Sequence, residues 1–252
     1  MTHTKLKKTQ LLKHHFNRIK SSEYTQVLLL RTFGNFLILT SLFFIGKTFY
    51  LPLREEIRFF IDNRIQKKYI VASSKEDSLK FTSQSSSQAK GLLASALQIK
   101  DVELLIPQDP NFSVVIPKIG ANARILSNVN AADSESYLEA LNSGVAHASG
   151  SKFPGEQGHI YLFAHSTDYF WNVGSYNAIF YLLNKLEKGD EIDIFYQGQR
   201  YVYNVTGSQV VEPTQVEYIT RQSNKEFLTL QTCWPPGTTL KRLLIFASRV
   251  EE

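Results

Sequence analysis

Cysteine is nearly absent from this sequence, because Cys233 is the only one among 252 residues. No disulfide can therefore form within the chain, and the Cys/His spacing of zinc sites is missing. The sequence also lacks a Gly-rich phosphate-binding loop. Free cysteine is among the most buried residue types, so Cys233 could be a small core residue. The alternative interpretation is a reactive thiol.

Outside its first 24 residues, the chain has no excess of basic over acidic residues. Six of the 28 Lys and Arg residues lie between Met1 and Tyr24, with one of the 23 acidic residues, so the remainder is balanced at 22 of each sign. A domain with balanced charge has no compositional support for binding a phosphate backbone. We therefore expect no nucleic-acid partner, and we assign the basic charge to a cytoplasmic tail, residues 1–24.

One long apolar run follows this tail. Residues 27–53 read VLLLRTFGNFLILTSLFFIGKTFYLPL, and only Arg31 and Lys47 interrupt them with charge. These two long side chains can reach the interface and so extend a short apolar centre to the thickness of a bilayer. A cleaved signal peptide is disfavoured by the missing small-residue cleavage site, and a buried core helix by the basic tail. We expect one membrane anchor, residues 25–50, with the N-terminus in the cytoplasm and the remainder extracytoplasmic.

The exported part divides into a spacer and a β-rich domain. Residues 51–100 begin with apolar residues at helical spacing and become Ser- and Gln-rich after Ala72, which predicts a partly helical stalk. Residues 101–252 contain short β-branched and aromatic runs between turn residues, which predicts a mainly β fold, a closed or nearly closed barrel with crossover helices. We predict helices over Ser134–Asn142, with Asp133 as N-cap, and over Tyr176–Leu186. The seven predicted strand runs are FSVVIPKI, ARILSNV, GHIYLFAH, EIDIFYQ, QRYVYNVTGSQVV, KEFLTLQTC and LKRLLIFASRV.

Cys233 ends one of these runs. Alternation along the strand puts Gln231 and Cys233 on the same face. The Trp-Pro-Pro-Gly sequence that follows cannot easily continue a ladder, so the thiol lies beside a loop that a substrate can reach. If residues 234–239 connect to the next strand, Arg242 pairs with Gln231 and becomes the diagonal neighbour of Cys233 on its face.

Three exported histidines are candidate partners of this thiol. His165 ends a strand run, and His159 begins the same run. We expect His147 in a Gly- and Ser-rich loop, where it could line a substrate groove. Their spacing alone does not choose among them.

Four segments resemble the sortase family and occur in the order typical of that family. They are IPKIG (116–120), GVAHASGSKFPG (144–155), GHIYLFAHS (158–166) and TLQTC (229–233), the last followed by the arginine of KRLLIFA. The resemblance covers about residues 111–252 and implies a closed β-barrel of about eight strands with a Cys-His-Arg site. It implies that Cys233 is the nucleophile and His165 the general acid and base, while Arg242 stabilises the oxyanion or holds the substrate backbone.

The resemblance also implies a substrate class. A sortase cleaves an LPxTG-like sorting motif near the C-terminus of an exported protein and passes the acyl group to an amine acceptor, a cell-wall precursor or a pilin lysine. We expect Thr232, Trp234 and His147 to contact the substrate. We expect no cofactor and no metal. The alternatives are a Cys-His peptidase that transfers the acyl group to water, and a catalytically silent surface binding domain.

Two details depart from the common family pattern or invite a second interpretation. Ala164 precedes His165 where many family members have glycine. Asp109-Pro110 resembles the lid motif of pilin-polymerising members, but it lies directly before the first barrel strand. We therefore expect a simple turn there.

Overall fold

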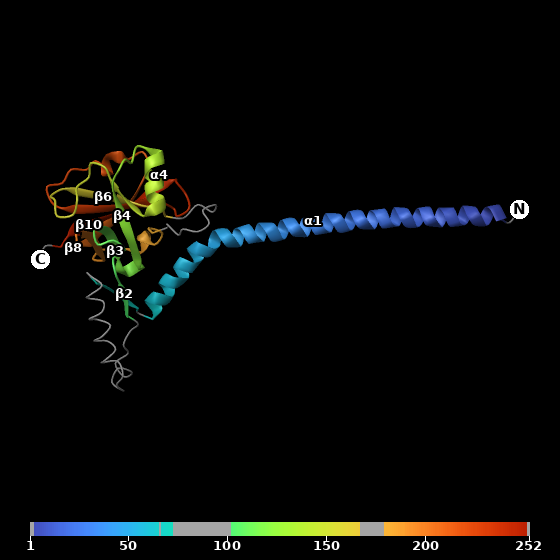
Figure 1. Cartoon of the computed structure of the whole chain (residues 1–252), viewed down its shortest axis with the longest axis horizontal. Helices are drawn as coiled ribbons and strands as arrows, with labels where there is room; N and C mark the ends of the chain where they lie inside the picture. The colour runs from blue at the N-terminus through green and yellow to red at the C-terminus, as the bar shows by residue number, and fades with distance from the viewer. Residues whose placement is uncertain (1–2, 66, 73–101, 167–178, 251–252) are drawn as a thin grey trace, which may run out of the picture. The chain divides into compact units, whose positions relative to one another are not determined.

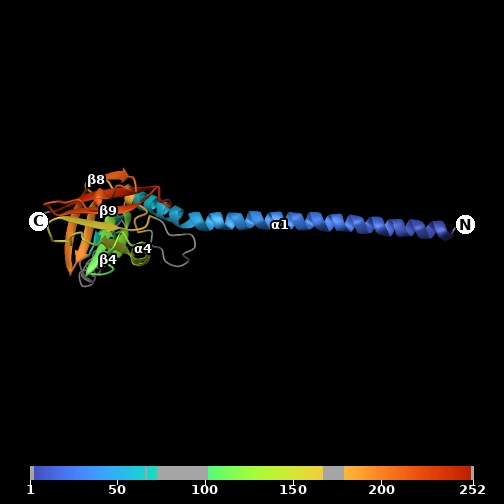
Figure 2. The same ribbon diagram turned by 90° about the horizontal axis from the view of Figure 1, so that it is seen from above.

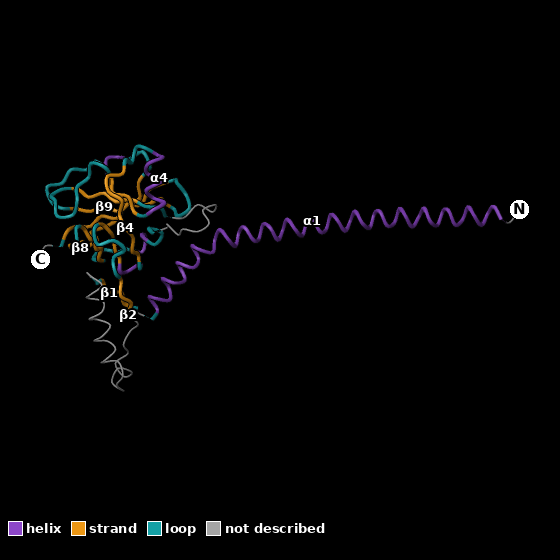
Figure 3. The backbone as a smooth tube through the Cα atoms, in the orientation of Figure 1, coloured by secondary structure: helices purple, strands orange, loops and turns teal. Residues whose placement is uncertain are grey.

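The computed structural model describes residues 3–65, 67–72, 102–166 and 179–250. The chain divides into two compact units, Met1–Leu51 and Pro52–Glu252. The first unit is helical throughout its described part, whereas strands dominate the second (Figure 3). Helix α1, His3–Arg64, crosses the boundary, where Pro52 has no backbone N–H to donate to the helix.

Residues Glu23–Tyr50 of α1 are long and apolar enough to cross a membrane. Their mean hydropathy is 1.8, and no part of this apolar stretch is buried inside the protein. Thr32 and Thr48 donate their hydroxyl protons to the carbonyl oxygens of Leu28 and Phe44 at 2.8 Å. These polar side chains are therefore satisfied within the helix, as a lipid environment requires.

Eight strands close into a barrel in the order β10-β8-β7-β3-β4-β5-β6-β9 (Figures 1 and 2). The neighbours β4–β5 and β6–β9 are parallel, and the other neighbours are antiparallel. The predicted fold class, a mainly β closed barrel with short crossover helices, is confirmed. The strands are β3 (Phe112–Ile116), β4 (Ala121–Val129), β5 (Val145–Ala148), β6 (His159–Phe163), β7 (Glu191–Tyr196), β8 (Gln199–Val211), β9 (Phe227–Trp234) and β10 (Lys241–Arg249).

Alternate residues of these strands fill the barrel with apolar side chains. This period of two follows from the pleat, which points successive side chains to opposite faces. All seven strand runs predicted from the sequence form barrel strands, so the alternation of their side chains predicted these strands correctly. The fully buried aliphatic residues include Val114, Ile116, Ile160, Leu162, Ile192, Ile194, Leu228, Leu230 and Ile245.

Strand β5 comes from a segment that the sequence predicted as a loop. It has four residues, and two of them are alanine, which has a weak preference for strands. Tertiary pairing decides its conformation, because β5 fills the gap between β4 and β6 and so closes that side of the barrel.

Helix α4, Ser134–Ser143, confirms the first predicted crossover helix, and Asp133 caps it by accepting the Glu135 N–H at 3.2 Å.

The second predicted helix, Tyr176–Leu186, is wrong for the residues that the structure describes. Residues 176–178 lie outside the described part, and residues 179–186 form turns and the 3₁₀ helix η2 (Leu183–Lys185). Phe180, Leu182 and Leu183 are all buried in the core, so three neighbouring positions face inward and no single helical face is apolar.

The end of α1 packs on the barrel. Phe59 contacts the barrel core. Arg58 pairs with Glu55 at 2.7 Å and donates from Nη2 to the carbonyl oxygen of Ile119 at 3.1 Å. The next residue, Gly120, has a φ of 61°, and a Cβ atom there would come within 2.6 Å of Arg58 Nη1. Glycine therefore permits both the left-handed turn and the close approach of the helix.

A small parallel sheet covers the barrel from outside. It consists of β1 (Lys68–Val71) and β2 (Val102–Leu105). Tyr69 and Val71 pack on a buried group formed by Leu105, Val115 and Phe195, on the outer face of β3 and β7. The segment between the apolar span and Ala72 thus belongs to the same packed unit as the barrel.

The Asp109-Pro110 pair forms the expected turn into β3. Asp109 Oδ1 accepts the backbone N–H of Asn111 at 2.8 Å, which is an Asx-turn. The carbonyl oxygen of Pro110 accepts the N–H of Gly198 at 3.0 Å, which ties this turn to the β7–β8 hairpin. The remaining 3₁₀ helices are η1 (Pro117–Ile119), between β3 and β4, and η3 (Val216–Tyr218), between β8 and β9.

Candidate active site

Cys233 lies one residue before the end of β9 and is half-buried. The chain then leaves the sheet through Pro235 and Pro236, which have no N–H for a ladder. The N–H of Thr238 closes this connection by donating to the carbonyl oxygen of Pro235 at 3.0 Å. The thiol therefore lies at the end of the barrel, beside a short and internally bonded loop.

Arg242 is directly opposite Cys233 on β10. The sequence predicted it as a diagonal neighbour, because the connection was expected at residues 234–239. The connection is residues 235–240, so the register differs by two residues and the shared face is kept. Among the described residues, Arg242 bonds only the carbonyl oxygens of Thr239 and Lys241, both from Nη1 at 3.1 Å. Its Nε and Nη2 protons are therefore available to an oxygen atom of a substrate.

His165 follows β6 by two residues. Strand β6 runs parallel to β9 with Phe163 beside Gln231, and the N–H of Ala164 donates to the carbonyl oxygen of Gln231 at 3.1 Å. Half-buried His165 lies two residues past the end of β6, so the chain carries it to the end of the barrel that holds Cys233. Strand β9 lies between β6 and β10, and Cys233 is paired with Arg242 across β9 and β10.

Two further residues, which the sequence did not indicate as site residues, lie near this end of the barrel. Gln231 lies one alternate position before Cys233 on β9, and Tyr161 lies two alternate positions before His165; the Tyr161 hydroxyl donates to Gln231 Oε1 at 2.5 Å. Burial raises the pKa of Tyr161 above its usual range, and the nearby positive charge of Arg242 offsets this only in part. Tyr161 is therefore a neutral hydrogen-bond donor. Alternation in the runs GHIYLFAH and TLQTC would have indicated this position.

The three predicted substrate contacts differ in accessibility. Trp234 is half-buried at the end of β9 and packs against the barrel core. Thr232 is buried, and its hydroxyl donates to the carbonyl oxygen of Ala164 at 2.9 Å. This bond makes Thr232 a link between β9 and the chain leading to His165.

His147 lies in β5 and not in a loop. Its exposed fraction is 0%, and its ring stacks on Phe153 with the centroids 4.5 Å apart. Nδ1 accepts the N–H of Asn128 at 3.3 Å, while Nε2 lies 3.0 Å from the carbonyl oxygen of Lys152. Both ring nitrogens thus serve the fold, and burial lowers the pKa of His147.

His159 is buried at the other end of β6 from His165. Its Nε2 lies 2.9 Å from the hydroxyl oxygen of Thr229, and its ring stacks on Phe227 with the centroids 4.7 Å apart. Burial lowers the pKa of His159 to about 4, and the positive charge of Arg221 acts in the same direction. The folded protein therefore keeps this imidazole neutral in mildly acidic solution.

We expect His159 to make the protein less stable in acid. An unfolded imidazole binds a proton below pH ~6.5, whereas the folded one does so only below pH about 4. The contribution of neutral His159 to the free energy of unfolding is therefore fully present above pH ~6.5. It is lost as the pH falls toward 4, by up to roughly 3 kcal/mol. Urea unfolding of the full chain at pH 7 and pH 4.5 measures this loss. His159→Gln should reduce it and His15→Gln should not; equal losses in all three proteins would contradict the assignment.

No group of three or more His, Cys, Asp or Glu side chains within residues 3–65, 67–72, 102–166 and 179–250 could hold a metal ion. Asp133, which begins α4, is used as its N-cap.

The structure thus combines a closed eight-stranded barrel with a half-buried thiol near the end of a strand. The model of the Sortase domain family matches residues 114–250. Sortase D of Bacillus subtilis (strain 168) is 30% identical over 168 residues, which are 65% of this chain and 76% of that protein. The chain belongs to the sortase family, whose members are cysteine transpeptidases.

Solved structures of sortases are also similar to the chain. Sortase C1 of GBS pilus island 1 is 28% identical, with a TM-score of 0.48, over 56% of this chain and 64% of that one. Sortase C-1 from Actinomyces oris is 28% identical, with a TM-score of 0.48, over 57% of this chain and 77% of that one. The chain thus spans slightly less than two thirds of the first of these structures.

Proposed function

We propose that this protein is a membrane-anchored transpeptidase that cleaves an LPxTG-like sorting motif of an exported protein and joins the new carboxyl end to an amine. The observation that carries the proposal is the pairing of Cys233 with Arg242 across β9 and β10, with His165 just past the end of β6, the other neighbour of β9. A nucleophile, a proton carrier and a fixed cation within reach of one carbonyl group are what acyl transfer needs.

The proposed reaction has two halves. His165 takes the proton of the Cys233 thiol as Sγ attacks the scissile carbonyl carbon; the C–N bond then breaks, and His165 gives this proton to the leaving amine. In the second half an acceptor amine attacks the thioester, the C–S bond breaks, and His165 takes the proton of the amine. Arg242 donates hydrogen bonds to the carbonyl oxygen, which carries negative charge in both tetrahedral intermediates.

Residues 25–50 would anchor the enzyme, with the basic tail, residues 1–24, in the cytoplasm. The supporting observation is the exposed apolar stretch Glu23–Tyr50. Residues 51–100 would then connect the membrane to the catalytic part, residues 101–252. This topology brings the thiol to the side of the membrane where exported proteins pass.

The products of a single reaction test this proposal. The full chain in detergent micelles is incubated with a quenched fluorescent LPxTG peptide, with and without triglycine, and the products are analysed by mass spectrometry. We expect a thioacyl-enzyme and, with triglycine, a new amide whose yield rises with acceptor concentration. Free acid as the only product at saturating triglycine would instead identify a hydrolytic Cys-His peptidase. A chain that never cleaves the peptide would favour a binding domain.

A further inference from the structure

The last turns of α1 carry an apolar face that the barrel does not cover. It consists of five large side chains, each between 48% and 60% exposed: Leu53, Ile57, Phe60, Ile61 and Ile65. Residues three or four positions apart lie on one side of a helix, so these five form a continuous stripe, here called the outer face of α1. A helix on the surface of a water-soluble domain carries polar side chains there, and an exposed apolar stripe marks an interaction surface.

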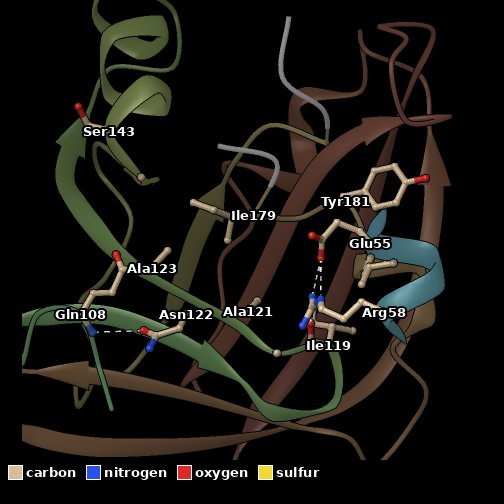
Figure 4. A pocket seen from close by; sticks show the side chains of 13 residues that line it. Glu55, Arg58, Gln108, Ile119, Ala121, Asn122, Ala123, Ser143, Ile179 and Tyr181 are labelled. Carbon is tan, nitrogen blue, oxygen red and sulfur yellow. Dashed lines mark hydrogen bonds and ion pairs between the residues drawn. The ribbon is translucent and has the colours of Figure 1, made fainter. Parts of the chain in front are cut away.

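The opposite side of the same helical turns is fixed on the barrel. Glu55 is buried, Phe59 packs against the barrel core, and Arg58 bonds the carbonyl oxygen of Ile119. Figure 4 shows Glu55, Arg58 and Ile119 together in the wall of a pocket. At about 100° per residue, the barrel-facing residues are centred on the side of the helix opposite to the outer face. The helix therefore lies between the barrel and whatever contacts the outer face.

The chain connects the outer face directly to the apolar stretch that we propose as the membrane anchor. That stretch ends at Tyr50, and Leu53 follows after about 5 Å of helix. Pro52 lies between them and permits a sharp bend, because proline has no N–H to donate and its ring crowds the carbonyl group of Thr48. The helix can therefore turn at the membrane surface, and three residues are too few to carry the outer face away from that surface.

Basic side chains accompany the outer face. Arg54, Arg64 and Lys68 are exposed, and none of them pairs with a carboxylate among the described residues. The Arg64 guanidinium lies over the ring of Phe60, 5.1 Å from its centroid, so a cation and a side chain of the apolar stripe share one surface. The carboxylates of this segment all have partners within the protein: Glu55, Glu56 and Asp62. An apolar stripe accompanied by unpaired cations has the composition of a helix that lies in the interface of an anionic membrane.

We propose that the outer face of α1 lies on the lipid bilayer, with its apolar side chains next to the first acyl carbons and its cations among the phospholipid phosphates. The inference rests on the membrane anchor proposed above and adds a second contact with the same bilayer. Residues 53–72 then act as a support that fixes the barrel beside the membrane, and not as a spacer that holds it away. A second copy or a partner protein would have to reach the outer face within the interface itself, which favours lipid as the occupant.

The test compares two sides of the same helical turn. Cys233→Ala removes the native thiol, and Ile61→Cys or Asn63→Cys then supplies the only attachment point for a nitrobenzoxadiazole label. Both residues are exposed, and they lie about 200° apart round the helix, so they differ in side and not in distance from the span. Each full chain is reconstituted into vesicles of phosphatidylcholine and phosphatidylglycerol, with and without phosphatidylcholine that carries a nitroxide near its headgroup in both leaflets.

We expect the nitroxide lipid to quench the label at residue 61 at least about threefold more than the label at residue 63. Equal quenching of the two labels would overturn the proposal, because no particular side of the helix would then face the lipid. A blue-shifted label at residue 61 that the nitroxide does not quench would also overturn it, since protein and not lipid would cover the outer face.

Two further measurements keep the result interpretable. Ile57→Cys repeats the experiment on the outer face, so loss of folding in one labelled chain does not decide the outcome. Flotation of the vesicles on a density gradient separates this proposal from the anchor itself. A full chain that does not float with the vesicles would refute the anchor, whereas a chain that floats without side-specific quenching would refute only the contact of the outer face.

Discussion

Replacing Cys233 with alanine should abolish cleavage of the LPxTG peptide, with a fall in kcat of at least ~10³-fold. Removing the nucleophile of a catalytic group costs roughly as much as removing the whole group, because the remaining members have no covalent intermediate to act on. The measurements are the rate of fluorescence increase and the mass of the enzyme after mixing, which should lack the acyl adduct.

Two comparisons make this result specific to the thiol. Cys233→Ser replaces the thiol with a hydroxyl of similar size, and it should be nearly as inactive because a hydroxyl is a far weaker nucleophile near neutral pH. Cys233 is half-buried, so neither variant should lower the thermal midpoint by more than a few degrees. Cleavage at the original rate by Cys233→Ala would show that another group does the chemistry.

Replacing Arg242 with lysine should lower kcat/KM for the sorting peptide by about 10²- to 10³-fold, although the positive charge is kept. The guanidinium lies opposite Cys233 and is held by the carbonyl oxygens of Thr239 and Lys241. Its fixed planar group can present further N–H donors to a developing oxyanion, whereas lysine has a single flexible ammonium. Initial rates over a range of peptide concentrations give this value.

Arg249→Lys is the matched control, because Arg249 lies at the far end of the same strand, opposite Tyr203. It should change kcat/KM of the folded enzyme less than about twofold, since nothing near Cys233 changes. If Arg242→Lys were also within twofold, the charge alone would suffice and the hydrogen-bonding role would be wrong.

Much of the barrel could be predicted from the sequence, because its strands carry their own period-two pattern. The run at residues 191–196 begins with alternating charged and apolar residues (EIDI) and forms β7, although its positions 192–195 are all buried. Residues 145–148 carry no such pattern, and pairing with strands on either side makes them β5. The docking of α1 was also missed, because the contact of Arg58 with Ile119 joins residues 61 apart and depends on a glycine turn.

The candidate site, like the barrel, could be predicted from the sequence only in part. The face shared by Cys233 and Arg242 follows from alternation, and it survived a register error of two residues because the side-chain period is two. The choice of His165 over His147 needed the family resemblance. His147 looked accessible in a Gly- and Ser-rich segment, and only the structure shows that β5 buries it. A pocket lined by Arg58, Gln108, Ile119, Gly144 and Ile179, among others, combines five separate segments, so no local pattern could indicate it.

The parallel pairing of β6 with β9 has a consequence for how the enzyme matures. The bond from Thr232 to Ala164 joins residues 68 apart, and contacts of such long range form late because the intervening chain must first lose its freedom. His165 follows β6 and Cys233 lies in β9, so the two residues come to neighbouring strands only once this pair has formed. If these residues act as proposed, a chain with an open barrel would carry the thiol without its base, and acyl transfer would begin only with barrel closure.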